Sequence, residues 1–596
     1  MDWTDLPGGL RSTGDTSIPI AFARRVVLLL FGAVLAVCGS SPAGEERIMD
    51  WRQYSVPERH KVKTRRPPDE EFLKLVPPLR EAPRFREEDE KLGAAIWWAD
   101  YSQFVFSEQP PTRDDLGRKP HIRTPAGEDE PLVLGLWGIE DAGKVTVEMF
   151  RSPFPVTVRM VVFAPKQIPE PYFGVTIEGG RTVGYATYLP EDATADVRAG
   201  ENTVFWITVS VPDDAKPGTY RIPLRVIFHA YRKGVDLPVT VEVLPFKLPR
   251  AKIAFGMYFR PFEQYLEKRY LTEPLMRAYW RDMARHGMTS ATLYNYASMT
   301  DNAGNFRLDG GHAIEWLKDM MEEGLVSTDV PIMYLGGITR TPENTQEILE
   351  EFVQEAKKRR WPKFYYYGPD EQSVNEKSLA AFKAIQPIRK YMPIVTAITD
   401  YSATAYADLL DIWVINAGRT TPEIRELAAK KDAQIWNYSC GMRGRGNAPF
   451  NRFYAGIYTW ALGLTGNFLW CYTEGSSWGT KIGTHNWVVT ADEGPIPSVA
   501  WETRREGVED YRLLSYLESL VAADPDGSEA KEARAWLQEI RGKVDWYLAR
   551  DMPPSLYPWD GPELYPLCPN FEPSELSEVR AKAIDYIMHL RKDGQE

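Results

Sequence analysis

Two adjacent carboxylates, Asp370 and Glu371, are the residues of this chain whose types and spacing best suit catalysis. They follow the run KFYYYGP, in which three tyrosines and Pro369 end a predicted strand. Neighbouring side chains on a strand point to opposite faces, so the two carboxyl groups act together only if the backbone bends there. Such a pair supplies a general acid and a charged partner. The alternative for an Asp-Glu dipeptide is a solvated turn.

The adjacency of the two groups restricts the chemistry further. Most glycoside hydrolases use carboxyl groups from different strands, about 5–5.5 Å apart in retaining enzymes and about 6.5–9.5 Å apart in inverting ones. An adjacent pair suits another arrangement, in which one carboxyl protonates the leaving oxygen and its neighbour orients a 2-acetamido group of the substrate as the nucleophile. If a separated pair is used instead, Asp400 and Glu474 are the fallback carboxylates.

The elements that must position these groups alternate between β-rich and helical segments from residue 250 to 500. Eight such units predict a (β/α)8 barrel. A doubly wound open sheet is the alternative, but no GxGxxG follows its first strand. The predicted strands are 253–259, 289–295, 330–337, 363–371, 392–400, 409–416, 433–439 and 467–473.

The carboxyl ends of the predicted strands carry aromatic, amide and acidic side chains. In a barrel these ends form the active site. Their mixture suits a neutral polyhydroxylated ligand better than a phosphate, which calls for Gly-rich loops and Lys. For the tryptophans and for Tyr472, core packing is an equal alternative. The predicted substrate-binding residues are Tyr258, Asn295, Tyr367, Asp400, Asn416, Trp436, Tyr438, Trp470 and Tyr472.

The remaining segments predict a multidomain protein. Short β-rich runs separated by turn clusters at 94–249 predict a β-sandwich, in which Trp97 and Trp98 are core residues. The charged, proline-rich segment 44–93 predicts a linker or a surface strap. Apolar residues at helical spacing in 501–596 predict helices that complete and extend the barrel. A dense charged motif there, containing Arg505, Glu506 and Asp510, predicts a structural ion-pair network that closes the barrel.

Composition excludes a polyanionic partner. The 596 residues carry a net charge of -12 and no stripe rich in Lys and Arg. Binding to nucleic acid needs a basic surface that displaces counterions from phosphates, so no nucleic-acid partner is expected. Aromatic residues make 12% of the chain. Such side chains stack on sugar rings, although a large core explains most of them.

The N-terminus predicts export. Twelve apolar residues at 26–37 follow a pair of arginines. This run is too short to span a bilayer but suits a signal peptide, which we predict at residues 1–43. The alternative to cleavage at Ala43 is lipid attachment at Cys38, the one membrane association that we expect.

Cysteine and histidine patterns predict no disulfide framework, metal site or cofactor. The cysteines at 440, 471 and 568 lack CxxC spacing, and the seven histidines form no HExxH motif.

Several segments resemble glycoside hydrolase family 123, β-N-acetylgalactosaminidases in which a β-sandwich precedes a (β/α)8 barrel. They span most of residues 95 to 520, and the last of them is the most specific. The segments are ENTVFWITVSVPDDAKPGTYRIPLRV with LPVTVEVLPFKLP, KFYYYGPDEQ, NRFYAGIYTWALGLTGNFLWCY and GPIPSVAWETRREGVEDYRLLSYLE.

The resemblance implies an exo-acting retaining hydrolase of glycans that end in β-linked N-acetylgalactosamine. Glu371 would be the general acid and base, Asp370 would hold the acetamido group, and the intermediate would be an oxazolinium ion. Glu371 must then carry a proton near neutral pH, and Asp370 must stay charged. Gln372 stands where the family has proline. The alternatives are a glycosidase acting on a sugar without an acetamido group and a glycan-binding protein without catalytic activity.

Overall fold

The structure is a computed structural model, and all of its described residues lie in one compact unit, residues 49–596. The predicted signal peptide with Cys38, most of the predicted linker, Asn295 and Asp400 lie outside the described residues. Among the helices that are described, none is long and apolar enough to cross a membrane. The described residues are 79–103, 105–168, 181–294, 313–335, 345–398, 403–417, 420–439, 448–474, 486–544, 571 and 573–593.

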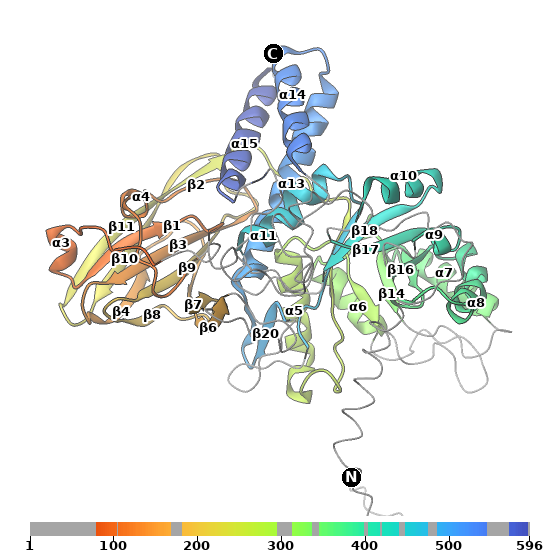
Figure 1. Cartoon of the computed structure of the whole chain (residues 1–596), viewed down its shortest axis with the longest axis horizontal. Helices are drawn as coiled ribbons and strands as arrows, with labels where there is room; N and C mark the ends of the chain where they lie inside the picture. The colour runs from red at the N-terminus through yellow and green to blue at the C-terminus, as the bar shows by residue number, and fades with distance from the viewer. Residues whose placement is uncertain are drawn as a thin grey trace, which may run out of the picture. The chain divides into compact units, whose positions relative to one another are not determined.

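Two mainly antiparallel sheets precede the barrel in the chain (Figure 1). Both sheets contribute to one apolar core cluster, which includes Leu134, Phe205, Val226 and Val241. One sheet has the order β1 (Ala94–Ala99), β3 (Asp129–Gly138), β9 (Asn202–Ser210), β5 (Val156–Met160). The other has the order β2 (His121–Pro125), β11 (Lys233–Leu244), β10 (Gly218–Phe228), β4 (Gly143–Met149), β8 (Thr194–Val197).

The tryptophan pair on β1 shows how strand alternation distributes aromatic side chains. Trp98 packs into the core that the two sheets share. Trp97 points to the opposite face, where it joins a second cluster with Trp137 and Trp206. Both side chains are buried, which agrees with the prediction that they are core residues.

Small elements complete this part of the chain: α3 (Glu87–Glu90), α4 (Arg113–Gly117), β6 (Phe163–Ile168) and β7 (Arg181–Ala186).

Eight parallel strands form a nearly closed barrel sheet, as the sequence predicts. Backbone hydrogen bonds close the barrel between the two strands that come first in the chain. The N–H groups of Thr289 and Ser290, which precede the second strand, both donate to the carbonyl of Phe255 in the first strand, each at 2.9 Å. A doubly wound sheet does not have this order. The strands, in the order of their pairing, are β12 (Ala254–Tyr258), β19 (Gly466–Trp470), β18 (Gln434–Ser439), β17 (Ile412–Asn416), β16 (Ile394–Ile398), β15 (Phe364–Tyr367), β14 (Ile332–Leu335) and β13 (Thr292–Tyr294).

Helices connect successive barrel strands, and α5 illustrates how the longer ones bury one apolar stripe. In α5 (Glu273–Arg285) the buried residues Met276, Tyr279, Trp280 and Met283 recur at helical spacing. The remaining connections are α6 (Ala313–Glu322), α7 (Thr345–Lys358), α8 (Glu376–Ala384), α9 (Ala403–Tyr406), α10 (Pro422–Lys430), α11 (Ala448–Phe453) and α12 (Thr459–Ala461). The segment Tyr454–Tyr458 between the last two is a π-helix, and one-turn helices lie at Lys268–Tyr270 and Gln386–Lys390.

A hairpin and three longer helices follow the last barrel strand. Ser498 caps the first of these helices by accepting a hydrogen bond from the Trp501 N–H at 3.2 Å. The elements are β20 (Val488–Ala491), β21 (Gly494–Pro497), α13 (Val499–Ala523), α14 (Ser528–Lys543) and α15 (Glu575–Asp593).

Two glycines allow α13 to approach the helical segment before β19 closely. A Cβ atom on Gly507 would lie 2.3 Å from the carbonyl oxygen of Arg452, and one on Gly456 would lie 2.6 Å from the carbonyl oxygen of Gly507. The Arg452 guanidinium also bonds the Asp510 carboxylate, with Nε 2.6 Å from Oδ2. The segments that contain Arg452 and Gly507 therefore pack directly on each other.

The predicted ion-pair network is present and fully buried. It does more than close the barrel, because it joins α13 to β3 and α15. Arg580 donates to Glu130 at 2.5 Å and to Glu509 at 2.7 Å. Glu130, Glu506 and Glu509 form a compact carboxylate group, and the Arg580 guanidinium bonds all three, so it already supplies a cation to them. Burial among other carboxylates raises the pKa of Glu506 to about 7 and holds that of Glu509 well above its usual value.

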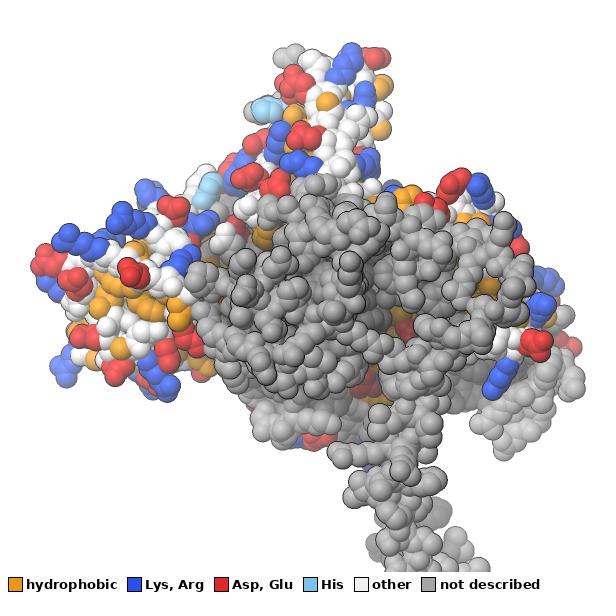
Figure 2. Space-filling model, viewed as in Figure 1, with side chains coloured by type: hydrophobic (Ala, Val, Ile, Leu, Met, Phe, Trp, Pro, Cys, Tyr) orange, Lys and Arg blue, Asp and Glu red, His pale blue; other side chains and the backbone are white. Residues whose placement is uncertain are grey.

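Charges on the described surface are mixed. Figure 2 shows Lys and Arg side chains interspersed with Asp and Glu over the described part of the visible face, both on the N-terminal sheets and on the C-terminal helices.

Candidate active site

The backbone bends at the end of β15, as joint action of the two carboxyl groups requires. The chain leaves the strand at Tyr367 and turns at Asp370 and Glu371, where Glu371 has a φ of 47°. Hydrogen bonds to β16 hold the bend: the Glu371 N–H donates to the Ala397 carbonyl at 3.0 Å, and the Thr396 hydroxyl donates to the Pro369 carbonyl at 2.9 Å. The left-handed φ breaks the strand alternation.

Each carboxylate of the pair accepts a hydrogen bond from a tyrosine of the barrel. Tyr367 donates to Asp370 Oδ1 at 2.6 Å, and Tyr438 donates to Glu371 Oε1. Both tyrosines belong to the group of side chains that fills the barrel interior. Both carboxylates are exposed, so they reach solvent while their oxygens are bonded to barrel side chains. The structure thus brings Asp370 and Glu371 together over the carboxyl-terminal end of the barrel.

Further predicted site residues line the same end. The rings of Tyr258 and Trp470 lie 5.7 Å apart, and the rings of Tyr258 and Tyr367 lie 6.2 Å apart. Asn416 ends β17 directly opposite Tyr438 in the strand register. Its side-chain Nδ2 is buried and has no hydrogen-bond partner among the described residues. A buried amide donor without a partner costs stability unless a ligand satisfies it.

Two predicted residues are placed elsewhere. Trp436 precedes Tyr438 by two positions on the same strand, so it faces the interior one layer lower, where it stacks on Phe468 at 5.4 Å. Tyr472 lies behind the barrel wall, where its hydroxyl donates to Asp282 of α5 at 2.7 Å. Both side chains are 0% exposed. Core packing, the alternative for both, accounts for their positions.

The surroundings of Asp370 shift its pKa upward. Loss of hydration in the crowded barrel mouth raises the pKa of Asp370 to about 6, and the negative charge of Glu371 acts in the same direction. The hydrogen bond from Tyr367 and the positive charge of Arg260 lower it. Asp370 is therefore mainly charged at neutral pH and protonated in mild acid.

Gln372, which replaces the expected proline, takes part in the turn. Its side-chain Nε2 donates to the carbonyl of Asp370 at 2.6 Å. Proline has no side-chain donor, so this contact is specific to the glutamine. It tethers the backbone between the two carboxylates.

Sequence reasoning missed Arg260 and Tyr265, and it treated Glu474 only as a fallback carboxylate. Arg260 bonds both Glu474 and the Tyr265 hydroxyl at the end of β12. The signal in the sequence was the position of Arg260, two residues after Tyr258, which the sequence predicts as a substrate-binding residue.

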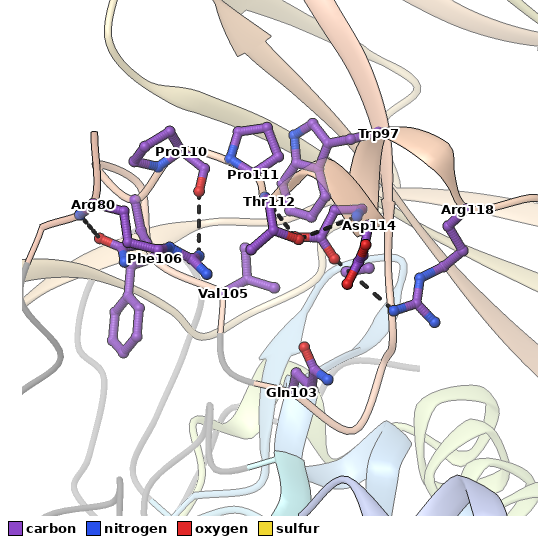
Figure 3. A pocket seen from close by; sticks show the side chains of 13 residues that line it. Arg80, Trp97, Gln103, Val105, Phe106, Pro110, Pro111, Thr112, Asp114 and Arg118 are labelled. Atoms are coloured by element: carbon purple, nitrogen blue, oxygen red, sulfur yellow. Dashed lines mark hydrogen bonds and ion pairs between the residues drawn. The ribbon is translucent and has the colours of Figure 1, made fainter. Parts of the chain in front are cut away.

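A cavity lies among the N-terminal elements, and none of the predicted site residues lines it. Its volume is about 250 Å³, and its walls include Trp97, Phe106 and Pro111. Figure 3 shows polar side chains around it, among them Arg80, which donates to the Pro110 carbonyl at 3.2 Å.

Comparison with known proteins identifies the fold. No family model matches the sequence, and no curated protein matches it. A family 123 glycoside hydrolase from Clostridium perfringens has a similar structure, with a TM-score of 0.58 and 11% identity over 84% of this chain and 99% of that one. A GH2 β-galacturonidase from Eisenbergiella tayi gives a TM-score of 0.31 at 10% identity, over 70% of this chain and 72% of that one. A β-glucuronidase from Parabacteroides merdae gives 0.27 at 12% identity, over 68% and 51%. The likeness to the Clostridium perfringens structure shows that the chain shares the multidomain fold of that glycoside hydrolase.

Proposed function

We propose that this protein is an exo-acting retaining glycoside hydrolase that cleaves terminal β-linked N-acetylgalactosamine by substrate-assisted catalysis. The observation that carries the proposal is the bend at Asp370 and Glu371. It directs two adjacent carboxylates to the same barrel mouth, and each is held by an inward-facing tyrosine. Two neighbours on one turn suit an acid and an orienting group better than two carboxyls on opposite sides of a bond.

The reaction follows from the two positions. The acetamido oxygen attacks the anomeric carbon as the bond to the leaving oxygen breaks, and that oxygen takes the proton of Glu371. The oxazolinium N–H faces the Asp370 carboxylate, which stabilises its positive charge. Water then adds to the anomeric carbon and gives a proton to Glu371 as the oxazolinium ring opens. Two inversions at one carbon retain the anomeric configuration.

Two further features support this assignment. The pKa of Asp370 is raised to about 6, which still leaves this carboxylate mainly charged at neutral pH, so its charge is compatible with the orienting role. The half-buried Trp470 and the amide of Asn416 provide an aromatic face and a donor for a neutral sugar, and the buried Tyr258 packs against the Trp470 ring. The structural neighbour from Clostridium perfringens is described as acting in glycolipid glycan hydrolysis. We propose a glycan with a terminal amino sugar as the substrate here too.

The domain arrangement and the location of the protein are part of the proposal. The two N-terminal sheets with their shared core form the β-sandwich of the family 123 arrangement. Residues 1–43 act as a signal peptide, so the hydrolase works outside the cytoplasm. Lipid attachment at Cys38 would keep it on the cell surface.

The first test uses p-nitrophenyl β-N-acetylgalactosaminide, the N-acetylglucosaminide and the galactoside. We expect hydrolysis of acetamido sugars alone. Glu371→Gln should lower kcat/KM by about 10²–10⁴-fold, the usual contribution of a general acid. Asp370→Asn should lower it by about 10²–10³-fold. Glu376→Gln, at an exposed carboxylate five residues further along, is the matched control. Hydrolysis of the galactoside, or full activity of Asp370→Asn, would indicate a separated carboxylate pair.

Leaving groups distinguish the roles of the two carboxylates. Loss of the general acid matters less when the leaving group needs no proton, so Glu371→Gln should recover activity on a 2,4-dinitrophenyl glycoside. Asp370→Asn should remain impaired on both substrates. The opposite pattern would make Asp370 the acid. Inactivity of the wild type on all three sugars would favour the glycan-binding alternative.

A further inference from the structure

An ion pair spans the ends of the first and last barrel strands. Arg260 follows β12 and Glu474 follows β19, and these strands are paired with Tyr258 opposite Trp470. Arg260 Nη2 donates to Glu474 Oε1, and Nη1 donates to the Tyr265 hydroxyl at 2.8 Å. The guanidinium also lies over two rings, 3.7 Å from the centre of Tyr265 and 4.6 Å from that of Trp470.

This pair belongs to the same end of the barrel as the two catalytic candidates. The Trp470 ring contacts Tyr258, the Tyr258 ring contacts Tyr367, and the Tyr367 hydroxyl bonds Asp370. The positive charge of Arg260 also lowers the pKa of Asp370. Arg260 therefore acts on the space beside the catalytic pair.

The stability of the fold does not explain the ion pair between Arg260 and Glu474 at the barrel mouth. The side chains of Arg260 and Glu474 are 21% and 27% exposed, so they are neither fully buried nor fully solvated. Partly exposed ion pairs contribute little to stability. Here the cation is instead held by two rings, a hydroxyl and a carboxylate, and the Glu474 backbone N–H is bonded to the Asn486 side chain. Such preorganisation is typical of ligand recognition.

The chemistry of the pair indicates what it binds. Guanidinium N–H groups donate and carboxylate oxygens accept, so together they match two neighbouring hydroxyl groups. Because the charges cancel, the pair suits a neutral sugar better than a sulfated or carboxylated one.

We infer that Arg260 and Glu474 determine sugar specificity by binding two vicinal ring hydroxyls of the terminal sugar. This inference rests on the proposed function, and it identifies the part of the sugar that the barrel mouth distinguishes. The acetamido group lies toward Asp370, so the hydroxyls recognised are those farther around the ring, on carbons 3 and 4.

Binding measurements test the inference without requiring turnover. Isothermal titration calorimetry would compare N-acetylgalactosamine with its 3-deoxy, 4-deoxy and 6-deoxy analogues on wild type, Glu474→Gln and Arg260→Lys. Lysine keeps the charge but loses the planar fork of donors. Asp236→Asn, which breaks an exposed ion pair with Arg225 on the β10–β11 hairpin, is the control.

We expect the wild type to lose about 10-fold or more in affinity when the 3- or 4-hydroxyl is removed, and little for the 6-hydroxyl. Both variants should bind the parent sugar about 10-fold more weakly and show no further loss with the 3-deoxy or 4-deoxy sugar. Equal losses for every analogue, unchanged binding, or no binding of any sugar would overturn the inference. A p-nitrophenyl assay on the same samples separates the two proposals. If the two variants lose the dependence on the 3- and 4-hydroxyls but the wild type shows no turnover, only the proposed function is refuted. If the wild type shows turnover but the variants keep that dependence, only the inference is refuted.

Discussion

The hydrogen bond between Tyr367 and Asp370 makes a quantitative prediction about pH. Substitution Tyr367→Phe removes the hydroxyl that donates to Asp370 at 2.6 Å and keeps the ring. This bond favours the charged carboxylate, so its loss raises the pKa of Asp370 above about 6. Because catalysis needs the charged form, the acid limb of kcat/KM should move to higher pH.

The size of the shift follows from the strength of the bond. A hydrogen bond to a charged group contributes about 1.5–3 kcal/mol. Neighbouring side chains reduce the hydration of Asp370, but the residue still reaches solvent, so water replaces much of the lost bond and about 1 kcal/mol remains. At 1.36 kcal/mol per pKa unit, this is a shift of about 0.7 unit. At pH 6 the variant should then keep about one third of the wild-type kcat/KM, while at pH 8 the two should differ little.

The assay is a profile of kcat/KM from pH 4.5 to 8.5 with the acetamido substrate. Tyr366→Phe is the matched control, because this neighbouring ring packs against the outer core of the barrel. Its profile should coincide with that of the wild type. An acid limb that stays in place in Tyr367→Phe, or moves to lower pH, would refute the reasoning that Asp370 acts as a charged group.

Three further substitutions test the site and the packing around it. Asn416→Ala removes the buried amide that has no partner among the described residues. It should raise KM for the acetamido substrate by about 10-fold with a smaller change in kcat. An unchanged KM would count against a ligand at this donor. Gly507→Ala should destabilise the fold by about 1–3 kcal/mol in urea unfolding, because the new Cβ meets a backbone oxygen at 2.3 Å. Gly542→Ala, which meets no atom within 4 Å, should be neutral or stabilising, so equal losses would contradict the steric explanation. Arg580→Met removes the guanidinium that bonds the buried Glu130 and Glu509 and should cost about 3–5 kcal/mol, and a loss below 1 kcal/mol would contradict a stabilising role for these bonds.

The positions of the barrel strands and of most site residues follow from the sequence. Alternation of β-rich and amphipathic segments is a local property, and it predicted each barrel strand to within a few residues. Since parallel strands bring their carboxyl ends together, the sequence also predicted that Asp370, Glu371, Tyr258 and Tyr438 share one end of the barrel.

Which way each side chain points was decided only by the tertiary structure. Asp370 and Glu371 reach the same opening because hydrogen bonds from β16 hold Glu371 at a left-handed φ, and no local pattern specifies bonds to a strand more than twenty residues away. Trp436 and Tyr438 lie on the same face of one strand. Trp436 occupies a lower layer of the barrel and is a core residue, whereas Tyr438 reaches the mouth, where its hydroxyl bonds Glu371. The pairing of Arg260 with Glu474 joins residues from opposite ends of the barrel sequence, which meet only because the first and last strands lie side by side. The sequence thus determined which chemical groups stand at the strand ends, and barrel closure determined which of them face one another.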